Sequence, residues 1–252
     1  LGISINEAHR YKKYWPSTFI MHRVNECDAR KGTQGVDEML RQTSSVTDFT
    51  LFVSNWMKNY HLEKGWKCQN TMVFVNGVKK DHFYPREKIN NGKVNIVTHH
   101  WSSNELKGFD IYNLLDEWVD NNPDFTFTYI GREQGNFKNT KVVSPLFGKA
   151  LGDELGKYDV YVSASRFDPG PNHVLESLAC EIPTYAHSDG GGSVEFSGED
   201  FTFSTMEDLE KILLSKNYSI NSMSPVDWSV QMNSLFNQLE LKVGHEKIKN
   251  PL

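Results

Sequence analysis

The sequence has few cysteines, and the three it has are far apart. Cys27, Cys68 and Cys180 form no metal-binding spacing and no disulfide framework. Such a pattern is typical of a reducing compartment, so we expect a cytoplasmic protein. We also expect no metal site, because the pair His99-His100 has no third ligand at a useful spacing.

Long apolar runs and an excess of positive charge are also missing. No segment approaches the roughly 18–20 apolar residues that span a membrane, and residues 1–5 do not begin a signal peptide. The formal net charge of -5 argues against a nucleic-acid-binding surface. Lys12 and Lys13 beside Trp15 suggest at most a peripheral contact with the inner face of a membrane. The 252 residues can form one or two globular domains.

Hydrophobic periodicity predicts strands that alternate with helices along most of the chain. Residues 1–16 show no clear pattern, and we expect an irregular lead-in there. Strands are predicted at 19–24, 49–54, 71–75, 94–98, 125–130, 141–143, 159–163, 183–186 and 201–203. Helices are predicted at 36–46, 54–65, 108–119, 149–155, 171–180, 206–214 and 228–241. This alternation predicts an α/β fold with parallel sheets covered on both faces, and the charged segment 79–93 is the best linker.

The segment 165–180 is a short loop that leads directly into a helix. Pro171 lies where the first helical turn begins, and Gly170 makes the loop before it tight. Val174, Leu175 and Leu178 follow at helical spacing and predict a buried face. The start of such a helix offers free N–H groups and a positive dipole end to a phosphate. Because the loop follows a strand, it lies where parallel sheets bind ligands.

Two carboxylates flank the start of this helix. Glu176 can accept two hydrogen bonds from a ribose diol, or it can be an ordinary helix residue. Asp168 can bind a sugar hydroxyl or act as acid, base or nucleophile, or it can be a turn residue. His173 shares a helix face with Glu176. An alternative is that Asp168 and Glu176 form a glycosidase pair.

Three further features can contact the same ligand. Lys107 stands at the start of a helix beyond the strand 94–98 and can hold a phosphate as a point charge. The turn with Gly190, Gly191 and Gly192 permits close approach of the backbone to a ligand, and Glu195 follows it. A glycosidase does not need this combination, which favours a phosphorylated ligand. An exposed lysine and a plain turn remain the simpler alternatives.

In this order the motifs resemble those of glycosyltransferase family 4, retaining enzymes of the GT-B type. Asp168 to Glu176 resembles the family's E-x7-E signature, and Leu175 to Pro183 resembles its LEAMACGxP run. Gly190 to Glu195 resembles its GGxxE turn, and Lys107-Gly108 its KG pair. In the first part of the chain, 52–54, 75–78 and 83–85 resemble the S-x-W and NGVDxxxFxP segments.

The resemblance implies a metal-independent, retaining glycosyltransferase of polysaccharide biosynthesis with two Rossmann-like domains. Residues 1–85 would form part of an acceptor-side domain, 86–223 a nucleotide-sugar-binding domain, and 224–252 a helix that crosses back. The donor would be a UDP or GDP sugar, without another cofactor, and the acceptor a glycan or glycolipid.

Residue roles follow from the same resemblance. Glu176 would hold the ribose and Asp168 the hydroxyls of the donor sugar. Lys107 and the helix start at Asn172, His173 and Val174 would hold the diphosphate. His22 matches a strand-end histidine that faces the acceptor in some relatives, and Asp168, Lys107 and His22 are the candidate catalytic residues.

The sequence departs from the family pattern in several places. Asp168 replaces a glutamate, and Glu181 replaces a glycine. The arginine usually found before the KG pair is absent, with Arg132 or Arg166 as candidates to compensate. The first domain is short, so we expect a truncated acceptor side. A non-catalytic nucleotide-sugar-binding module is therefore an alternative, and a sugar-nucleotide epimerase is another.

Overall fold

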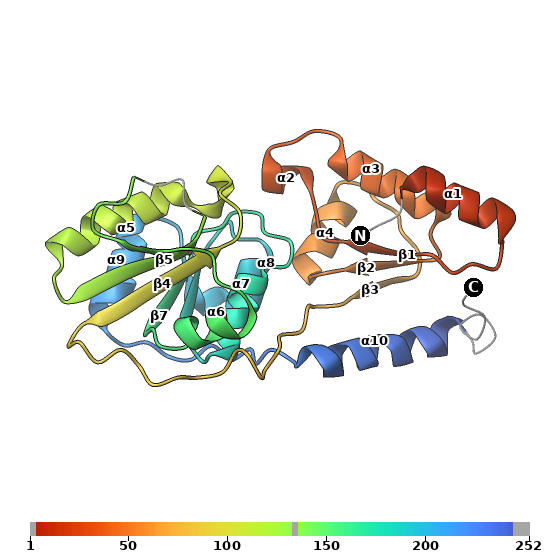
Figure 1. Ribbon diagram of the computed structural model, residues 1–252. Helices are drawn as coiled ribbons and strands as arrows, with labels where there is room; N and C mark the ends of the chain where they lie inside the picture. Colours follow the sequence, from red (N-terminus) through yellow and green to blue (C-terminus); the bar gives the residue numbers. More distant parts are fainter. Residues whose placement is uncertain (1–3, 133–135, 244–252) are drawn as a thin grey trace.

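The computed structural model describes residues 4–132 and 136–243, which form two α/β units and a C-terminal helix (Figure 1). Within these ranges the first unit has a three-stranded parallel sheet in the order β1-β2-β3. Its elements are α1 (Ile5–Tyr14), β1 (Met21–Val24), α2 (Asp28–Lys31), α3 (Val36–Thr43), η1 (Ser44–Val46), β2 (Phe49–Phe52), α4 (Asn55–Glu63) and β3 (Thr71–Val73).

The second unit has a larger sheet. Its described strands are all parallel, in the order β6-β5-β4-β7-β8-β9. The strands are β4 (Val94–His100), β5 (Phe125–Gly131), β6 (Lys141–Val143), β7 (Val160–Ser163), β8 (Thr184–His187) and β9 (Thr202–Phe203). The helices are η2 (Glu105–Lys107), α5 (Phe109–Asn121), α6 (Gly148–Leu155), α7 (Asn172–Ala179), α8 (Gly192–Ser197), η3 (Glu199–Phe201) and α9 (Met206–Ser215).

Helices cover both faces of this second sheet. One buried core joins the sheet to α5 and α9, for example through Leu115 and Leu209. A second core joins the other face to α6 and α7, for example through Leu155 and Leu178. The prediction of an α/β fold with parallel sheets is therefore confirmed.

The strand order changes direction at β4. From β4 the chain moves outward to β5 and β6, and it then returns to place β7 on the other side of β4. A ligand site in such a sheet is expected beyond the carboxyl ends of the strands at this switch point. Lys107, the last residue of η2, follows β4, and Asp168 lies in the loop after β7.

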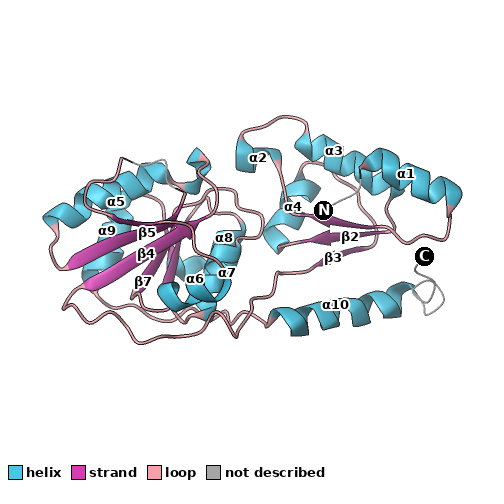
Figure 2. Ribbon diagram, in the orientation of Figure 1, coloured by secondary structure: helices cyan, strands magenta, loops and turns pink. Residues whose placement is uncertain are grey.

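The last described helix, α10 (Trp228–Val243), lies beside the sheet of the first unit (Figure 2). Leu235 and Leu239 pack against Phe49 and Leu51 of β2 and against Phe74. The chain thus leaves the first unit near residue 74 and returns to it at its end. Within residues 4–132 and 136–243, no helix has the length and apolar content needed to cross a membrane.

The prediction of an irregular lead-in at residues 1–16 was wrong for the helix α1, and residues 1–3 lie outside the described residues. Ser4 and Glu7 form a reciprocal capping box, in which Glu7 N donates to Ser4 Oγ and Ser4 N donates to Glu7 Oε2. This cap starts α1 although the helix buries little apolar surface. Lys12 Nζ donates to Asp48 Oδ2 at 2.5 Å, so one of the two lysines suggested for a membrane contact is paired with a carboxylate of the first unit. The membrane contact itself stays a prediction.

Two further local predictions differ from the structure. The glycine-rich segment was predicted as a turn, with a role in ligand binding or as a plain turn, and α8 begins within it at Gly192. Pro171 was predicted inside the first helical turn and is instead the N-cap residue of α7. The short helix α2 was not predicted at all.

Candidate functional site

A cavity of about 400 Å³ lies beyond the carboxyl ends of β4 and β7. It brings together side chains from the two units and from widely separated parts of the sequence. The predicted site residues that line it are Lys107, Asp168, Gly170, Asn172, His173 and Glu176, and lining residues that were not predicted include Arg30, His99, His100, Trp101 and Phe147.

The central contact of the cavity is an ion pair between Lys107 and Asp168. Lys107 Nζ lies 2.7 Å from Asp168 Oδ2, and the two side chains are 12% and 6% exposed. Burial acts to raise the pKa of Asp168, but the charges of Lys107 and Arg30 outweigh it and hold this pKa below its ordinary value. Asp168 is therefore an ionised, hydrogen-bond-accepting group at neutral pH.

Local backbone geometry fixes both partners of this pair. Gly108, directly after Lys107, has a φ of +91°, and a Cβ there would lie 2.3 Å from the carbonyl oxygen of Ala164. No other residue type fits so close to the end of β7. On the other side, Asp168 N donates to Gly190 O and Gly192 N donates to Asp168 O.

The start of α7 faces the same cavity. Asn172 and His173 are its first two residues, and the first N–H groups of a helix have no intrahelical acceptor. His173 is buried, with Nε2 2.9 Å from Ser163 Oγ. Burial, followed by the charge of Lys107, sets the pKa of His173 well below its ordinary value, so the ring is neutral. The start of α7 can therefore bind an anion through its backbone N–H groups, next to a His173 ring that carries no charge.

Glu176 and His99 form a second polar pair in the cavity. His99 Nε2 lies 2.8 Å from Glu176 Oε2, and Glu176 remains 24% exposed. Next to it His100 is buried against Tyr112, whose hydroxyl lies 2.7 Å from His100 Nε2. The strand prediction stopped at Thr98, two residues early, and therefore missed that both histidines lie on β4. In the described part of the chain, no group of three or more His, Cys, Asp or Glu side chains is arranged to hold a metal ion.

Aromatic side chains form the outer edge of the cavity. The rings of Trp101 and Phe147 are 4.8 Å apart in an edge-on arrangement, and both residues are more than half exposed. The guanidinium of Arg132 lies 4.1 Å from the centre of the Trp101 ring. An exposed pair of rings offers a flat, apolar surface to a planar ligand.

Other predicted residues do not line this cavity. The three glycines Gly190, Gly191 and Gly192 are not among its lining residues. They contact the backbone of Asp168 instead, where Gly191 forms an isolated β-bridge with it. Glu195 instead meets the first unit: its carboxylate accepts hydrogen bonds from Asn55 N, Asn55 Nδ2 and Trp56 N at 3.0, 2.9 and 2.7 Å. It thereby caps α4. The donor-binding roles of these residues stay predictions.

His22 lies within the first unit rather than at the cavity. Its ring centre is 6.0 Å from that of Trp66, and it is not among the residues that line the cavity. Burial lowers the pKa of His22 to about 4, with His61 adding to the effect. The acceptor-facing role of His22 stays a prediction from the resemblance.

Neither of the two candidate arginines is among the described residues that line the cavity. Arg166 donates from Nη1 and Nη2 to the two carboxylate oxygens of Asp110 at 2.8 and 2.6 Å. Arg132 covers Trp101. The arginine that reaches the cavity is Arg30 of the first unit, which no sequence motif indicated.

Comparison with solved structures identifies the fold. No family model matches the sequence, and no curated protein matches it. The structure is similar to Anabaena HepE in complex with UDP, with a TM-score of 0.73 at 12% identity over 94% of this chain and 76% of that one. It is also similar to sucrose-phosphate synthase from Thermosynechococcus elongatus, with a TM-score of 0.67 at 15% identity over 88% and 68%. The TarM structure matches with a TM-score of 0.63 at 13% identity over 91% and 47%. The chain thus has the fold of GT-B glycosyltransferases.

Proposed function

We propose that this protein binds a nucleoside diphosphate sugar in the cavity and transfers the sugar to a glycan or glycolipid acceptor. The observation that carries the proposal is the grouping of Lys107, Asp168, Glu176 and the start of α7 around one cavity at the switch point of the sheet. The GT-B fold is consistent with this function. UDP is the first nucleotide to test, because HepE was solved with UDP and with UDP-glucose.

Each part of the donor has a chemically suitable partner. The N–H groups at the start of α7 and the ammonium of Lys107 suit the diphosphate. Glu176, which is partly exposed and accepts from His99, can accept from the ribose hydroxyls instead. The nucleobase would lie against Trp101 and Phe147.

The proposed chemistry is electrostatic. When the bond between sugar and diphosphate breaks, negative charge grows on the leaving diphosphate. Lys107 and the start of α7 are in place to stabilise this charge, which lowers the barrier without a metal ion. Asp168, held ionised beside Lys107, can accept hydrogen bonds from the donor sugar. Retention of configuration at the transferred carbon is part of the proposal and follows from the family resemblance.

The test combines ligand binding with turnover. UDP, GDP and their glucose and N-acetylglucosamine conjugates are screened by thermal shift, and release of the free nucleotide is then measured with and without glycan acceptors. We expect stabilisation by one nucleoside diphosphate and sugar release that Asp168→Asn abolishes. Stabilisation without any release would instead support a binding module. If no nucleotide stabilises the protein, the proposal is wrong.

A further inference from the structure

Arg30 is the one residue of α2 that lines the cavity of the described chain. The helix α2 belongs to the first unit, whereas Lys107, Asp168 and the start of α7 belong to the second. A guanidinium from one unit therefore faces an ion pair of the other. The charge of Arg30 acts on this ion pair, because it adds to the charge of Lys107 in lowering the pKa of Asp168.

Two reciprocal carboxylates hold α2 in this position. Asp28 accepts hydrogen bonds from Thr33 Oγ1 and from the backbone N–H groups of Val36 and Asp37 at 2.9–3.2 Å. Asp37 in turn accepts from the backbone N–H of Asp28 at 2.9 Å. The two contacts tie the start of α2 to the start of α3.

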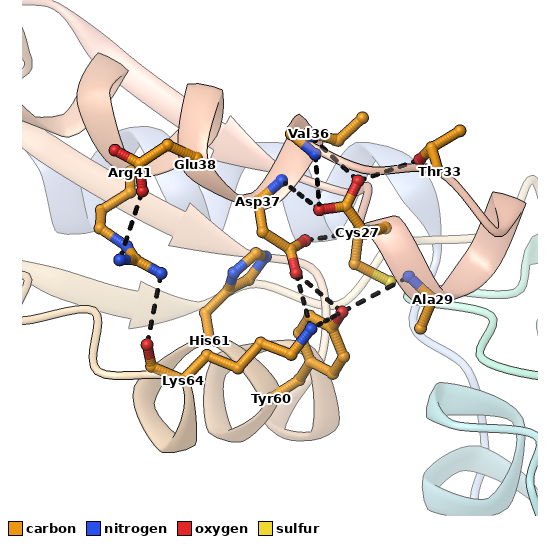
Figure 3. A network of polar contacts seen from close by, with 12 residues as sticks. Cys27, Ala29, Thr33, Val36, Asp37, Glu38, Arg41, Tyr60, His61 and Lys64 are labelled. Atoms are coloured by element: carbon orange, nitrogen blue, oxygen red, sulfur yellow. Dashed lines mark hydrogen bonds and ion pairs between the residues drawn. The ribbon is translucent and has the colours of Figure 1, made fainter.

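A second layer fixes Asp37 itself (Figure 3). Tyr60 Oη on α4 and Nζ of Lys64, the C-cap residue of α4, each donate to Asp37 Oδ2 at 2.8 Å. Burial acts to raise the pKa of Asp37, but Lys64, the Asp28 N–H and Tyr60 outweigh it and lower this pKa. Asp37 is thus ionised, and α2 is anchored to both α3 and α4.

The guanidinium of Arg30 is held loosely compared with its helix. Arg30 Nη1 lies 3.5 Å from Asn25 O and 3.4 Å from Glu26 Oε2, both long for hydrogen bonds. Lys31 contacts the same Glu26 more closely, at 2.8 Å. A loosely held guanidinium on a helix that is anchored at its start suits a residue that closes on an incoming anion.

The charges of the cavity show why a second cation is needed. Lys107 is already paired with Asp168, and Glu176 adds another carboxylate. Burial keeps the pKa values of His100 and His173 well below the ordinary range, so these rings add no positive charge at neutral pH. Among the described residues that line the cavity, removal of Arg30 would leave a diphosphate with two carboxylates, Asp168 and Glu176, and one cation, Lys107.

We propose that Arg30 binds the diphosphate of the donor together with Lys107, so that the phosphate subsite is completed by the first unit. This inference rests on the proposed function, and it adds a specific residue to it. A guanidinium can bind phosphate oxygens through two parallel N–H donors, which a lysine cannot do. Phosphate binding would then require the two units to face each other as they do in this structure.

The experiment measures UDP affinity by titration calorimetry and uridine binding by NMR titration for the full chain and three variants. Arg30→Ala removes the guanidinium, and Arg30→Lys keeps the charge without the two parallel donors. Arg10→Ala removes an exposed arginine of α1 and is the matched control. Melting temperatures without ligand check that each variant is folded.

We expect Arg30→Ala to weaken UDP binding about tenfold to a hundredfold, the range for a hydrogen bond to a charged group. Arg30→Lys should fall between Arg30→Ala and the unchanged protein, and uridine binding should not change. Arg10→Ala should bind UDP like the unchanged protein. The inference is wrong if folded Arg30→Ala binds UDP with unchanged affinity, or if it loses UDP and uridine equally. Failure of the unchanged protein to bind any nucleoside diphosphate would instead overturn the proposed function, and this inference with it.

Discussion

Replacing Lys107 by methionine tests the central ion pair of the cavity. Methionine keeps an unbranched side chain of similar length and removes only the charge and its donors. Asp168 would then keep a carboxylate that is 6% exposed and has lost its 2.7 Å partner. The residual positive charge nearby would be that of Arg30.

The size of the effect follows from the burial of Asp168. Breaking a buried ion pair by removing one partner typically costs about 3–5 kcal/mol of unfolding free energy, because a charge is left uncompensated. We expect about 3 kcal/mol for Lys107→Met, the low end of that range, since Arg30 still opposes the charge. Adding Asp168→Asn removes the stranded charge, so the double variant should recover more than half of the loss.

The pH dependence of the loss has a definite sign. In the unchanged protein the pKa of Asp168 is lowered on folding, so its stabilising contribution is constant at pH 5–7 and is lost only in stronger acid. In Lys107→Met burial should raise this pKa above its ordinary value. Protonation of Asp168 then removes the unpaired buried charge as the pH falls. The difference in unfolding free energy between the two proteins should therefore shrink from pH 7 to pH 5.

Urea unfolding of the three proteins at pH 7 and pH 5 measures these quantities. Burial is the main cause that holds the pKa values of the neighbouring His100 and His173 well below their ordinary value, so these rings are neutral at pH 7. A loss below about 1 kcal/mol for Lys107→Met, or a loss that is equal at both pH values, would refute the view of Asp168 as a buried carboxylate that depends on Lys107.

Three further predictions concern capping and donor recognition. Glu195→Ala leaves two N–H groups of α4 without their acceptor and should lower the unfolding free energy by about 1–2 kcal/mol in urea titrations, whereas the exposed Asp200→Ala should not. Glu176→Gln should weaken UDP binding about tenfold but leave binding of a 2′,3′-dideoxy analogue, which lacks both ribose hydroxyls, nearly unchanged, measured by calorimetry. Ser4→Ala removes half of the α1 capping box and should speed hydrogen exchange in α1 by about fivefold, for a loss of about 1 kcal/mol.

The sequence could predict the part of the site that local rules determine. Lys107 and Asp168 are separated by 61 positions, yet each follows a strand of one parallel sheet. Once those strands are recognised by periodicity, their carboxyl ends must meet at one edge. The buried face of α7 was predicted for the same reason, since Val174, Leu175 and Leu178 repeat at helical spacing and are buried.

Contacts between the two units could not be predicted in this way. Glu195 follows a glycine-rich turn, a pattern that favours a ligand-binding role, but its carboxylate caps α4 across the unit boundary. A carboxylate satisfies a helix N-terminus and a sugar hydroxyl by the same hydrogen bonds, so sequence does not separate the two roles. The position of Arg30 could not be predicted for a related reason. Its short helix α2 is held by polar contacts and lacks the regular spacing of apolar residues from which a helix is predicted.

The missed histidines of β4 show a different limit. A strand buried on both faces normally reads as a continuous apolar run, and the run in β4 ends before Thr98. The strand continues because its polar end is satisfied inside the fold, where His100 meets the hydroxyl of Tyr112 at 2.7 Å. Only tertiary contacts reveal that this segment is a strand: its pairing with Ile130 and Gly131 of β5, and the contact from α5.

The loop between β7 and α7, residues 164–171, is itself held in place by the first unit. Ser54 Oγ, at the start of α4, donates to Pro169 O at 2.5 Å, and a Cβ on Gly170 would lie 2.8 Å from Val53 Cγ2. The segment Pro169–Gly170 and Glu195 thus both contact the start of α4. The helix α2 is linked to the same helix through Asp37. A rotation between the units would break these contacts and would also withdraw Arg30 from the cavity. The proposed binding of a diphosphate by Arg30 and Lys107 would therefore couple ligand binding to the arrangement of the units through α4, because a ligand that spans the two residues stabilises that arrangement.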